Sequence, residues 1–421
     1  MTPEGWGRVP VSGLVASVGV GVSVKGHSRP AGTGEVGVLR ISSVTYGTFR
    51  PGENKVVVDE DLSRVKESPR AGCVLVSRAN TQELVGASAY VAEDHPGLVL
   101  PDKLWQLVPA PAIADGRWLQ LVLSTPQMRG RISEAATGTS GSMKNIGREQ
   151  FLALDVLVPP LPEQRKIAAI LSSVDDAIAA SQAVIDQIQV VKKALMAELL
   201  TKGLPGRHHR FKQTEIGEVP EAWDIRPLGD VASVERGRFS HRPRNDPRFF
   251  GGDTPFVQTG DVAASGGRLR RFSQTLNDAG LAVSRLFPAG TIVLTIAANI
   301  GDTGIAAFPV AFPDSLVGIQ AGQSVDNRFL ELVLRTRKKE LDDAAPQNAQ
   351  KNINLEILRP VLIQVPPLSE QVEIADAVEA IDDRLSSEKD ALSALRATKS
   401  ALMSVLLTGE LRVRVDEEVA A

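Results

Sequence analysis

The chain has little cysteine, histidine or aromatic side chain, and each shortage excludes a class of protein. Its single cysteine, Cys73, cannot form a disulfide within the chain, which indicates a reducing compartment. We interpret Cys73 as a small buried hydrophobe, because no histidine pattern accompanies it that would support a nucleophile. The five histidines stand outside HExxH and Cys–His ligand spacings, so the sequence predicts no metal site.

Segments that direct a chain to export or to a membrane are also missing. Residues 1–10 lack a basic start followed by an apolar run, and we find no run of about 20 apolar residues. We therefore expect a cytoplasmic protein without a membrane partner. The net charge of −3 argues against non-specific coating of nucleic acid, although a specific DNA reader depends on local charge.

Signatures of a catalytic chain are absent as well. No GxxxxGK[ST] phosphate loop occurs, which argues against ATP hydrolysis by this chain. The short glycine clusters Gly19–Gly21 and Gly32–Gly34 do not open a strand–helix–strand unit with a downstream acid, so we interpret both as loops. The sequence thus predicts no cofactor bound by this chain and no catalytic residue.

What the sequence does contain is an internal repeat with a constant offset of 207 residues. Lys144-Asn145-Ile146 returns at 351–353, and the VPPLPEQ segment at 158–164 returns as VPPLSEQ at 365–371. The offset holds without insertion up to Thr201 and Thr408, whereas the residues before each copy share little. A repeated frame joined to two divergent segments predicts a pseudo-two-fold molecule with two different surfaces.

The repeated frame predicts two long helices, at residues 159–203 and 366–410. Apolar residues recur there in alternating steps of three and four, which is the seam of a coiled coil. Neither helix can bury this stripe alone, so we expect the two helices to pair, and the alternation of globular segment and helix along the chain favours an antiparallel pair. Polar residues interrupt the seam at 181/388 and at 192/399; they either fix the register or, for the lysines, extend to solvent at a frayed end. The predicted interface residues are Ile167, Leu171, Val174, Ile178, Ile185, Ile188, Leu195, Ile374, Val378, Ile381, Leu385, Leu392, Leu395 and Leu402.

The remaining segments predict two α/β (α+β) globular domains. The first spans residues 1–158, and the second, with a linker, spans 204–365; residues 411–421 form a flexible tail. β-Branched or apolar runs at 36–41, 55–58, 73–76 and 291–296 predict strands. Residues 118–123 begin either a helix or a strand that ends before Pro126.

Several loops of both domains resemble nucleic-acid contacts. Residues 236–245 hold four arginines, one histidine and one asparagine, and arginine donates bidentately to guanine or phosphate while amides pair with adenine. Taken alone, any one of these segments could equally be an ordinary solvent-exposed loop without a DNA contact. The predicted DNA-binding residues are Arg78, Asn80, Ser142, Lys144, Asn145, Arg236, Arg238, His241, Arg242, Arg244, Asn245, Gln258, Thr259, Asn299, Gln347, Gln350, Lys351 and Asn352.

Two divergent domains, each closing on Lys-Asn-Ile and then VPPL-x-EQ before a long helix, resemble the specificity (S) subunit of type I restriction-modification enzymes. The segments GRFSHRPRNDP, PFVQTGDV, TIAANIGDTGI and APQNAQKNI resemble one class of target-recognition domain; SRANT, LPDKLWQL and TGTSGSMKNI resemble another. The resemblance covers nearly the whole chain, and only residues 1–37 match less clearly.

The resemblance implies a fold and a set of partners. Two target-recognition domains, separated by an antiparallel coiled coil, would each read one half of a bipartite, asymmetric target in double-stranded DNA. The helices would set the spacer and dock two methyltransferase (M) subunits. S-adenosylmethionine, ATP and Mg would belong to these M subunits and to the restriction (R) subunits.

Three alternatives stay open at this point. The chain is a coiled-coil adaptor with two peptide-binding domains, which leaves the arginine- and amide-rich loops without a role. Or it serves a solitary methyltransferase without a nuclease, which the sequence does not distinguish from the first interpretation. Or it is a nuclease or methyltransferase acting alone, against which the missing cofactor loops argue. The DNA bases recognised and the spacer length are not readable from the residues.

Overall fold

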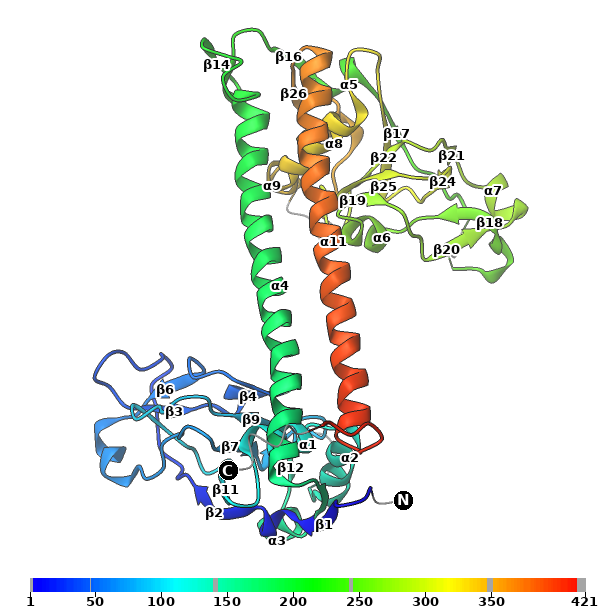
Figure 1. Cartoon of the computed structure of the whole chain (residues 1–421). Coiled ribbons are helices and arrows are strands. Elements are labelled where there is room, and N and C mark those ends of the chain that lie inside the picture. Colours follow the sequence, from blue (N-terminus) through cyan, green and yellow to red (C-terminus); the bar gives the residue numbers. More distant parts are fainter. Residues whose placement is uncertain (1–2, 46, 139–142, 242–244, 347–350, 415–421) are drawn as a thin grey trace. The chain divides into compact units, whose positions relative to one another are not determined.

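A computed structural model describes residues 3–45, 47–138, 143–241, 245–346 and 351–414. These residues form two compact units, and the division falls inside both long helices. The first unit contains residues 1–182 and 390–421, and the second contains residues 183–389. Each unit therefore combines one globular domain with one part of each long helix (Figure 1).

The first unit is built from short strands and one long helix that continues into the second unit. Its strands are β1 (Gly7–Pro10), β2 (Val15–Val20), β3 (Gly37–Leu39), β4 (Val44–Thr45), β5 (Thr48–Phe49), β6 (Asn54–Val56), β7 (Val74–Ser77), β8 (Ala79–Asn80), β9 (Ser88–Tyr90), β10 (Leu98–Val99), β11 (Leu104–Pro109), β12 (Lys144–Asn145) and β13 (Asp155–Val158). Its helices are α1 (Gly116–Leu123), α2 (Pro126–Ala135), α3 (Arg148–Leu152) and the start of α4 (Leu161–Lys202). Short 3-10 turns lie at Val11–Gly13, Ile41–Ser43 and Asp59–Arg64.

The second unit has the same kind of construction. Its strands are β14 (Phe211–Thr214), β15 (Gly217–Pro220), β16 (Asp224–Pro227), β17 (Ala232–Arg236), β18 (Phe250–Phe256), β19 (Gly267–Leu269), β20 (Gln274–Leu276), β21 (Leu286–Phe287), β22 (Ile292–Thr295), β23 (Thr303–Ala306), β24 (Val310–Ala311), β25 (Leu316–Ala321) and β26 (Leu362–Val365). Its helices are α5 (Leu228–Val231), α6 (Thr259–Ala264), α7 (Asp278–Ala282), α8 (Asn327–Thr336), α9 (Lys338–Asp343), α10 (Leu355–Leu358) and the start of α11 (Leu368–Leu406), with a 3-10 turn at Pro247–Phe249.

The two domains share one strand order although their sequences diverge. The first contains a sheet of order β2-β11-β7-β9, and the second contains the order β17-β25-β22-β23, extended by β19. In both domains a buried strand lies inside the sheet, and a two-stranded ladder precedes the long helix, β1 with β13 and β16 with β26. The fold repeats where the sequence does not, because any alternation of apolar residues can fill these positions.

The seam residues are buried to different depths along the helices. Ile167 and Leu171 join the core beneath α1 in the first unit, and Ile374 and Val378 join the core beneath α8 in the second. Ile185 and Leu392 are also buried, whereas the remaining predicted members are half-buried: Val174, Ile178, Ile188, Leu195, Ile381, Leu385, Leu395 and Leu402. Two helices alone leave the flanks of a seam open, so most of its members stay partly accessible.

The polar seam positions settle the register inside each unit. Lys192 forms an ion pair with Asp382 in the second unit, and Lys399 pairs with Asp175 at 2.5 Å in the first. Both partners of the second pair lie 207 residues from those of the first. With Arg396 bonded to Gln182 at 3.5 Å, the order of contacts along the helices is antiparallel. The lysines are therefore paired across the helices rather than extended at a frayed end.

Several local predictions are confirmed. The predicted strands at 36–41, 55–58, 73–76 and 291–296 correspond to β3, β6, β7 and β22, and residues 118–123 lie in helix α1. Cys73 is buried, and burial raises the pKa of its thiol. Among the described helices, α4 contains an 18-residue window of mean hydropathy 1.3, which by length and composition alone would be apolar enough to cross a membrane. A helix built into a protein core passes the same test.

Candidate nucleic-acid interface

The repeated EQ pair forms a joint between each domain and its long helix. The Gln164 side chain donates to the carbonyls of Ile113 and Pro159 at 2.9 Å and accepts from the Asp115 amide at 2.9 Å. Asp115 in turn caps α1 by accepting from the amide of Trp118. Gln371 makes the corresponding bonds to Ser324, Pro366 and Asp326, and Asp326 caps α8. The motif that marks the repeat is therefore structural.

The glutamate of each pair is a buried carboxylate held by a tryptophan and a basic side chain. Glu163 accepts from Trp6 Nε1 at 3.1 Å and from Arg412 Nε and a terminal guanidinium nitrogen at 2.7 and 2.9 Å. The hydrogen bond between Arg412 and Glu163 raises the pKa of the Arg412 guanidinium above its usual value.

Glu370 accepts from Trp223 Nε1 at 3.2 Å and contacts His208 Nε2 at 2.8 Å. A second tryptophan and a second basic side chain thus occupy corresponding places in the two units.

The Lys-Asn-Ile segments meet the chain just beyond the buried strand of each sheet. In the first unit Ile146 N donates to Arg78 O at 3.0 Å, and Lys144 and Asn145 pair with Asn80 and Ala79. In the second unit Ile353 N donates to Ile296 O at 3.0 Å, and Asn352 pairs with Ala297. The structure thus brings together predicted residues that are far apart in the sequence, in the same way in both units.

The side chains at these two junctions differ in what they bind. Arg78 donates to the Asp102 carbonyl at 2.7 Å, and Asn80 bonds to Ser77 and to the Thr81 amide. Lys351 pairs with Asp342 at 2.7 Å, while Asn299 is exposed. Ala298, beside Asn299, has a φ of 64°, an uncommon conformation for a residue with a Cβ that holds this loop in a tight turn.

The arginine-rich segment at 236–245 is attached to neighbouring loops by its own guanidinium groups. Arg236 donates to Asp314 O at 2.6 Å, and Arg238 donates to Ser284 O at 2.8 Å. His241 contacts Asp246 at 3.2 Å and lies against the ring of Phe249, whereas Asn245 is exposed. Hydrogen bonds from Arg248 hold the pKa of Asp246 well below its usual range. These arginines therefore shape the loop besides presenting charge.

Gln258 and Thr259 lie at the start of α6. Gln258 caps this helix together with Asp261 and donates from Nε2 to Gln274 Oε1 at 3.0 Å. Five predicted contacts fall outside the described residues: Ser142, Arg242, Arg244, Gln347 and Gln350.

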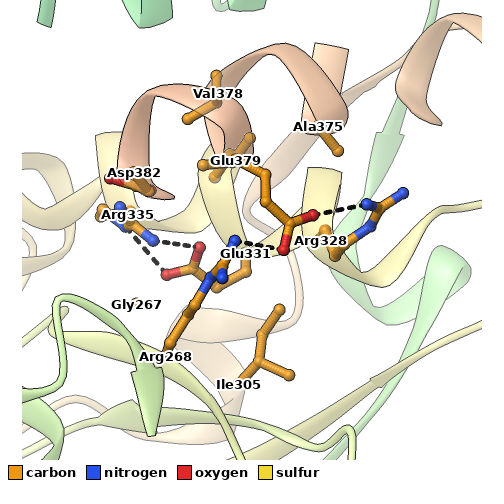
Figure 2. Close-up of a pocket in the computed structure, with 11 residues that line it drawn as sticks. Gly267, Arg268, Ile305, Arg328, Glu331, Arg335, Ala375, Val378, Glu379 and Asp382 are labelled. Atoms are coloured by element: carbon orange, nitrogen blue, oxygen red, sulfur yellow. Dashed lines mark hydrogen bonds and ion pairs between the residues drawn. The ribbon is translucent and has the colours of Figure 1, made fainter. Parts of the chain in front are cut away.

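An ion network that the sequence did not predict holds the second domain to α11. Arg328 at the start of α8 pairs with Asp376 at 2.6 Å and with Glu379 at 2.8 Å, and Arg268 of β19 binds the same Glu379 (Figure 2). Arg335 pairs with the buried Glu331 at 2.6 Å beside them. In the first unit the corresponding arginine, Arg117, donates to Ser172 at 2.7 Å, a neutral partner that stands 207 residues before Glu379. The two domains are thus held at equivalent places by different chemistry.

Each unit also carries an open groove between its domain and the end of a long helix. The grooves have volumes of ≈ 630 Å³ in the second unit and ≈ 810 Å³ in the first. Their helix-borne linings correspond at the 207-residue offset: Gln189, Lys192, Lys193, Met196, Ala197, Leu200 and Thr201 in one, and Arg396, Lys399, Ser400, Met403, Ser404, Leu407 and Thr408 in the other. The grooves are more alike than the loops that carry the predicted DNA contacts.

Comparison with known proteins decides the family. The model of the type I restriction modification DNA specificity domain matches residues 72–190 and again 220–396, which together make up more than half of the chain. The chain belongs to this type I specificity family. Its members are the DNA-recognition subunits of restriction-modification systems, not catalytic ones.

Similar proteins carry the same description. The MjaX specificity subunit of Methanocaldococcus jannaschii, named as a type I restriction enzyme subunit, is 27% identical over 98% of this chain and 95% of its own. The EcoEI specificity subunit of Escherichia coli is 24% identical over 41% of this chain and 29% of its own.

The solved S subunit from M. genitalium shares the fold, with a TM-score of 0.61 at 14% identity over 95% of this chain and 96% of the other. A chain from a study of type I complex assembly and conformational transition gives 0.60 at 16% identity, over 98% and 100%.

The type I specificity fold explains which residues repeat and which do not. The joint residues repeat in both units, and so do the groove residues that lie on the long helices. In contrast, the loops beyond the sheets differ. No cluster of three or more His, Cys, Asp and Glu that could hold a metal occurs within the described ranges.

Proposed function

We propose that each domain of this specificity subunit reads one half of a bipartite, asymmetric DNA target. The main support is that the two units share their strand order, joints and grooves while their candidate contact loops differ. The repeated strand order and joints indicate that both units hold their loops in the same way. Loops that differ on that frame call for two different base sequences, because base edges in the major groove carry the sequence information.

The same proposal assigns the repeated grooves to two copies of one partner, the M subunit. Two surfaces that correspond residue by residue bind two identical partners in equivalent ways. Met196 and Met403 are flexible, polarizable side chains suited to such contacts. Lys192 and Lys399 line the same grooves, beside the cross-helix ion pairs.

The long helices would then set the spacer between the two half-sites. A helix of 42 residues such as α4 is about 63 Å long at 1.5 Å per residue, and one turn of DNA rises about 34 Å. S-adenosylmethionine for methylation, and ATP and Mg for the R subunits, would be bound by the partners. The complex would act in the cytoplasm and need no membrane.

Exchange of one domain tests the two-half reading. Residues 206–365 are replaced by the corresponding segment of another specificity subunit, and the M subunit is supplied to the hybrid. Methylation of random DNA is expected to reveal a bipartite motif in which only one half has changed. If both halves changed, or neither did, the assignment of one domain to one half would be wrong.

Substitution of the groove threonines tests the assignment of the M subunits. Thr201 and Thr408 are exposed, line the two grooves and are equivalent at the repeat offset. Thr201→Arg and Thr408→Arg are each expected to reduce bound M subunits from two to one, because the large cation blocks one groove. The double variant is expected to bind none, as measured by mass photometry at about 100 nM.

Thr33→Arg, at an exposed threonine that lines neither groove, serves as the control and should bind two M subunits. Two bound M subunits in the double variant would contradict the assignment of the grooves.

A further inference from the structure

Almost every described arginine of the second unit already has an acceptor within that unit. Arg236 and Arg238 donate to backbone carbonyls, and Arg268, Arg328 and Arg335 pair with carboxylates. The others behave in the same way: Arg207, Arg210, Arg226, Arg248, Arg285, Arg337, Arg359 and Arg384. Among the arginines that the structure describes in this unit, only Arg270 and Arg271 are without a partner.

These two arginines are adjacent and exposed, and they stand on a well-anchored connection. Residues 270–273 join β19, the edge of the five-stranded sheet, to β20, the edge of the four-stranded sheet. Leu269 just before them is buried in the core between the sheets. Phe272 just after them is 42% exposed and packs edge-on against Phe308 at 5.2 Å. The segment therefore presents two cations and part of an aromatic ring from a rigid support.

Polar side chains with hydrogen-bonding capacity surround the pair. Ser273 donates to Asp261 at 2.9 Å, and Gln274 is tied to Gln258, one of the residues that the sequence analysis selected. Gln258 and Gln274 use one donor and one acceptor in the hydrogen bond between them. Their remaining amide donors and acceptors can still bind a base edge. The arginines and the predicted contact residue Gln258 thus lie in one neighbourhood.

The ion network of Figure 2 fixes this neighbourhood to the long helix. Arg268, two residues before Arg270, binds Glu379 and also contacts Asp383 at 3.2 Å, both on α11. Strand β19, which leads directly into the arginine pair, is therefore attached to α11 through Arg268. A contact with DNA made here would be held in constant register with α11.

We propose that Arg270 and Arg271 bind the DNA of the half-site read by the second domain. This inference rests on the proposed function. Two uncompensated guanidinium groups offer bidentate donors for phosphate or guanine, and they lose no internal partner on binding. Because arginine without a carboxylate partner keeps its full charge toward DNA, each contact contributes to the salt dependence of binding.

The test compares alanine variants of the assembled complex of the S and M subunits. Arg270→Ala and Arg271→Ala are each expected to weaken binding to the cognate duplex by about tenfold or more, and the double variant by about a hundredfold. The slope of log K against log salt should fall by about 0.9 for each phosphate contact removed. Arg210→Ala is the matched control, since its side chain is 86% exposed and lies in the same unit; it should bind as the unchanged protein does.

Arg270→Gln with Arg271→Gln keeps polar side chains of similar shape and guards against misfolding, which thermal unfolding checks. Arg→Lys variants separate the two sources of binding: recovery of affinity indicates phosphate contacts, and no recovery indicates base contacts, and both support the proposal. Binding of the double alanine variant within twofold of the unchanged protein overturns it. If the domain exchange still altered one half-site in that case, the proposed function would stand and only this inference would fail.

Discussion

Replacement of Glu370 by alanine is expected to lower the free energy of unfolding of the second unit by about 3–5 kcal/mol. The carboxylate is 1% exposed and accepts hydrogen bonds from the indole of Trp223 and the amide of Leu204, besides contacting His208. Alanine leaves these buried donors without an acceptor and removes the joint between the linker and the start of α11. The loss therefore exceeds that of a single hydrogen bond.

Glu373, one turn further along α11, provides a matched control. Its ion pair with Arg207 lies in solvent, since the Arg207 side chain is 40% exposed and the Glu373 side chain 48%. Glu373→Ala should therefore lower the free energy of unfolding by less than about 1 kcal/mol. Urea unfolding followed by far-UV circular dichroism measures both variants. A loss of under about 1 kcal/mol for Glu370→Ala would show that the carboxylate does not hold the joint.

Leu171→Asp is expected to prevent folding of the first unit, at a cost of about 5 kcal/mol or more. Leu171 is 0% exposed and packs in the core that also contains Trp118 of α1 and Leu406 of α11. Aspartate removes this apolar contact and places a charge inside the apolar core. Because the core joins the domain to both long helices, all three parts lose their support together.

Val190→Asp is the corresponding change on the open side of the same helix. Val190 is 64% exposed, so the charge stays in water and the unfolding midpoint should change little. Limited proteolysis gives a second readout: the Leu171→Asp protein should be cleaved rapidly within residues 1–160, and the Val190→Asp protein should not. Equal resistance of the two variants would mean that the seam is not what stabilises the first unit.

The long helices were predictable from the sequence, because a seven-residue apolar stripe leaves few alternatives. Their antiparallel pairing was predictable because globular segments and helices alternate along the chain. The cross-helix ion pairs were only half predictable: Lys192 and Lys399 interrupt the stripe visibly, but nothing near them in the sequence identifies Asp382 and Asp175 as partners. The common strand order of the two domains was not predictable. Its short strands are specified by burial alone, and very different residues satisfy that requirement.

The sequence showed which loops are rich in arginine and amide side chains. It did not show which of these side chains lack a partner in the folded protein. Arg236 and Arg238 stood out by their density, yet their acceptors, at 314 and 284, are distant in sequence. Arg270 and Arg271 were missed, although three arginines followed by an aromatic residue within 268–272 were a usable signal. Whether an arginine pairs within the protein depends on acceptors that the fold brings close from distant parts of the chain. The neighbouring residues in the sequence do not reveal those acceptors.

The division of both long helices between the units has a consequence for biosynthesis. Residues 390–414 supply the first unit with the end of α11 and with Arg412, the guanidinium on Glu163. A ribosome makes these residues about 200 positions after residue 182, where the earlier part of the first unit ends, so the apolar face of its helix stays uncovered until residues 390–414 have been made. We expect chaperone dependence and premature termination to affect the amino-terminal domain most, although it is the first to be made.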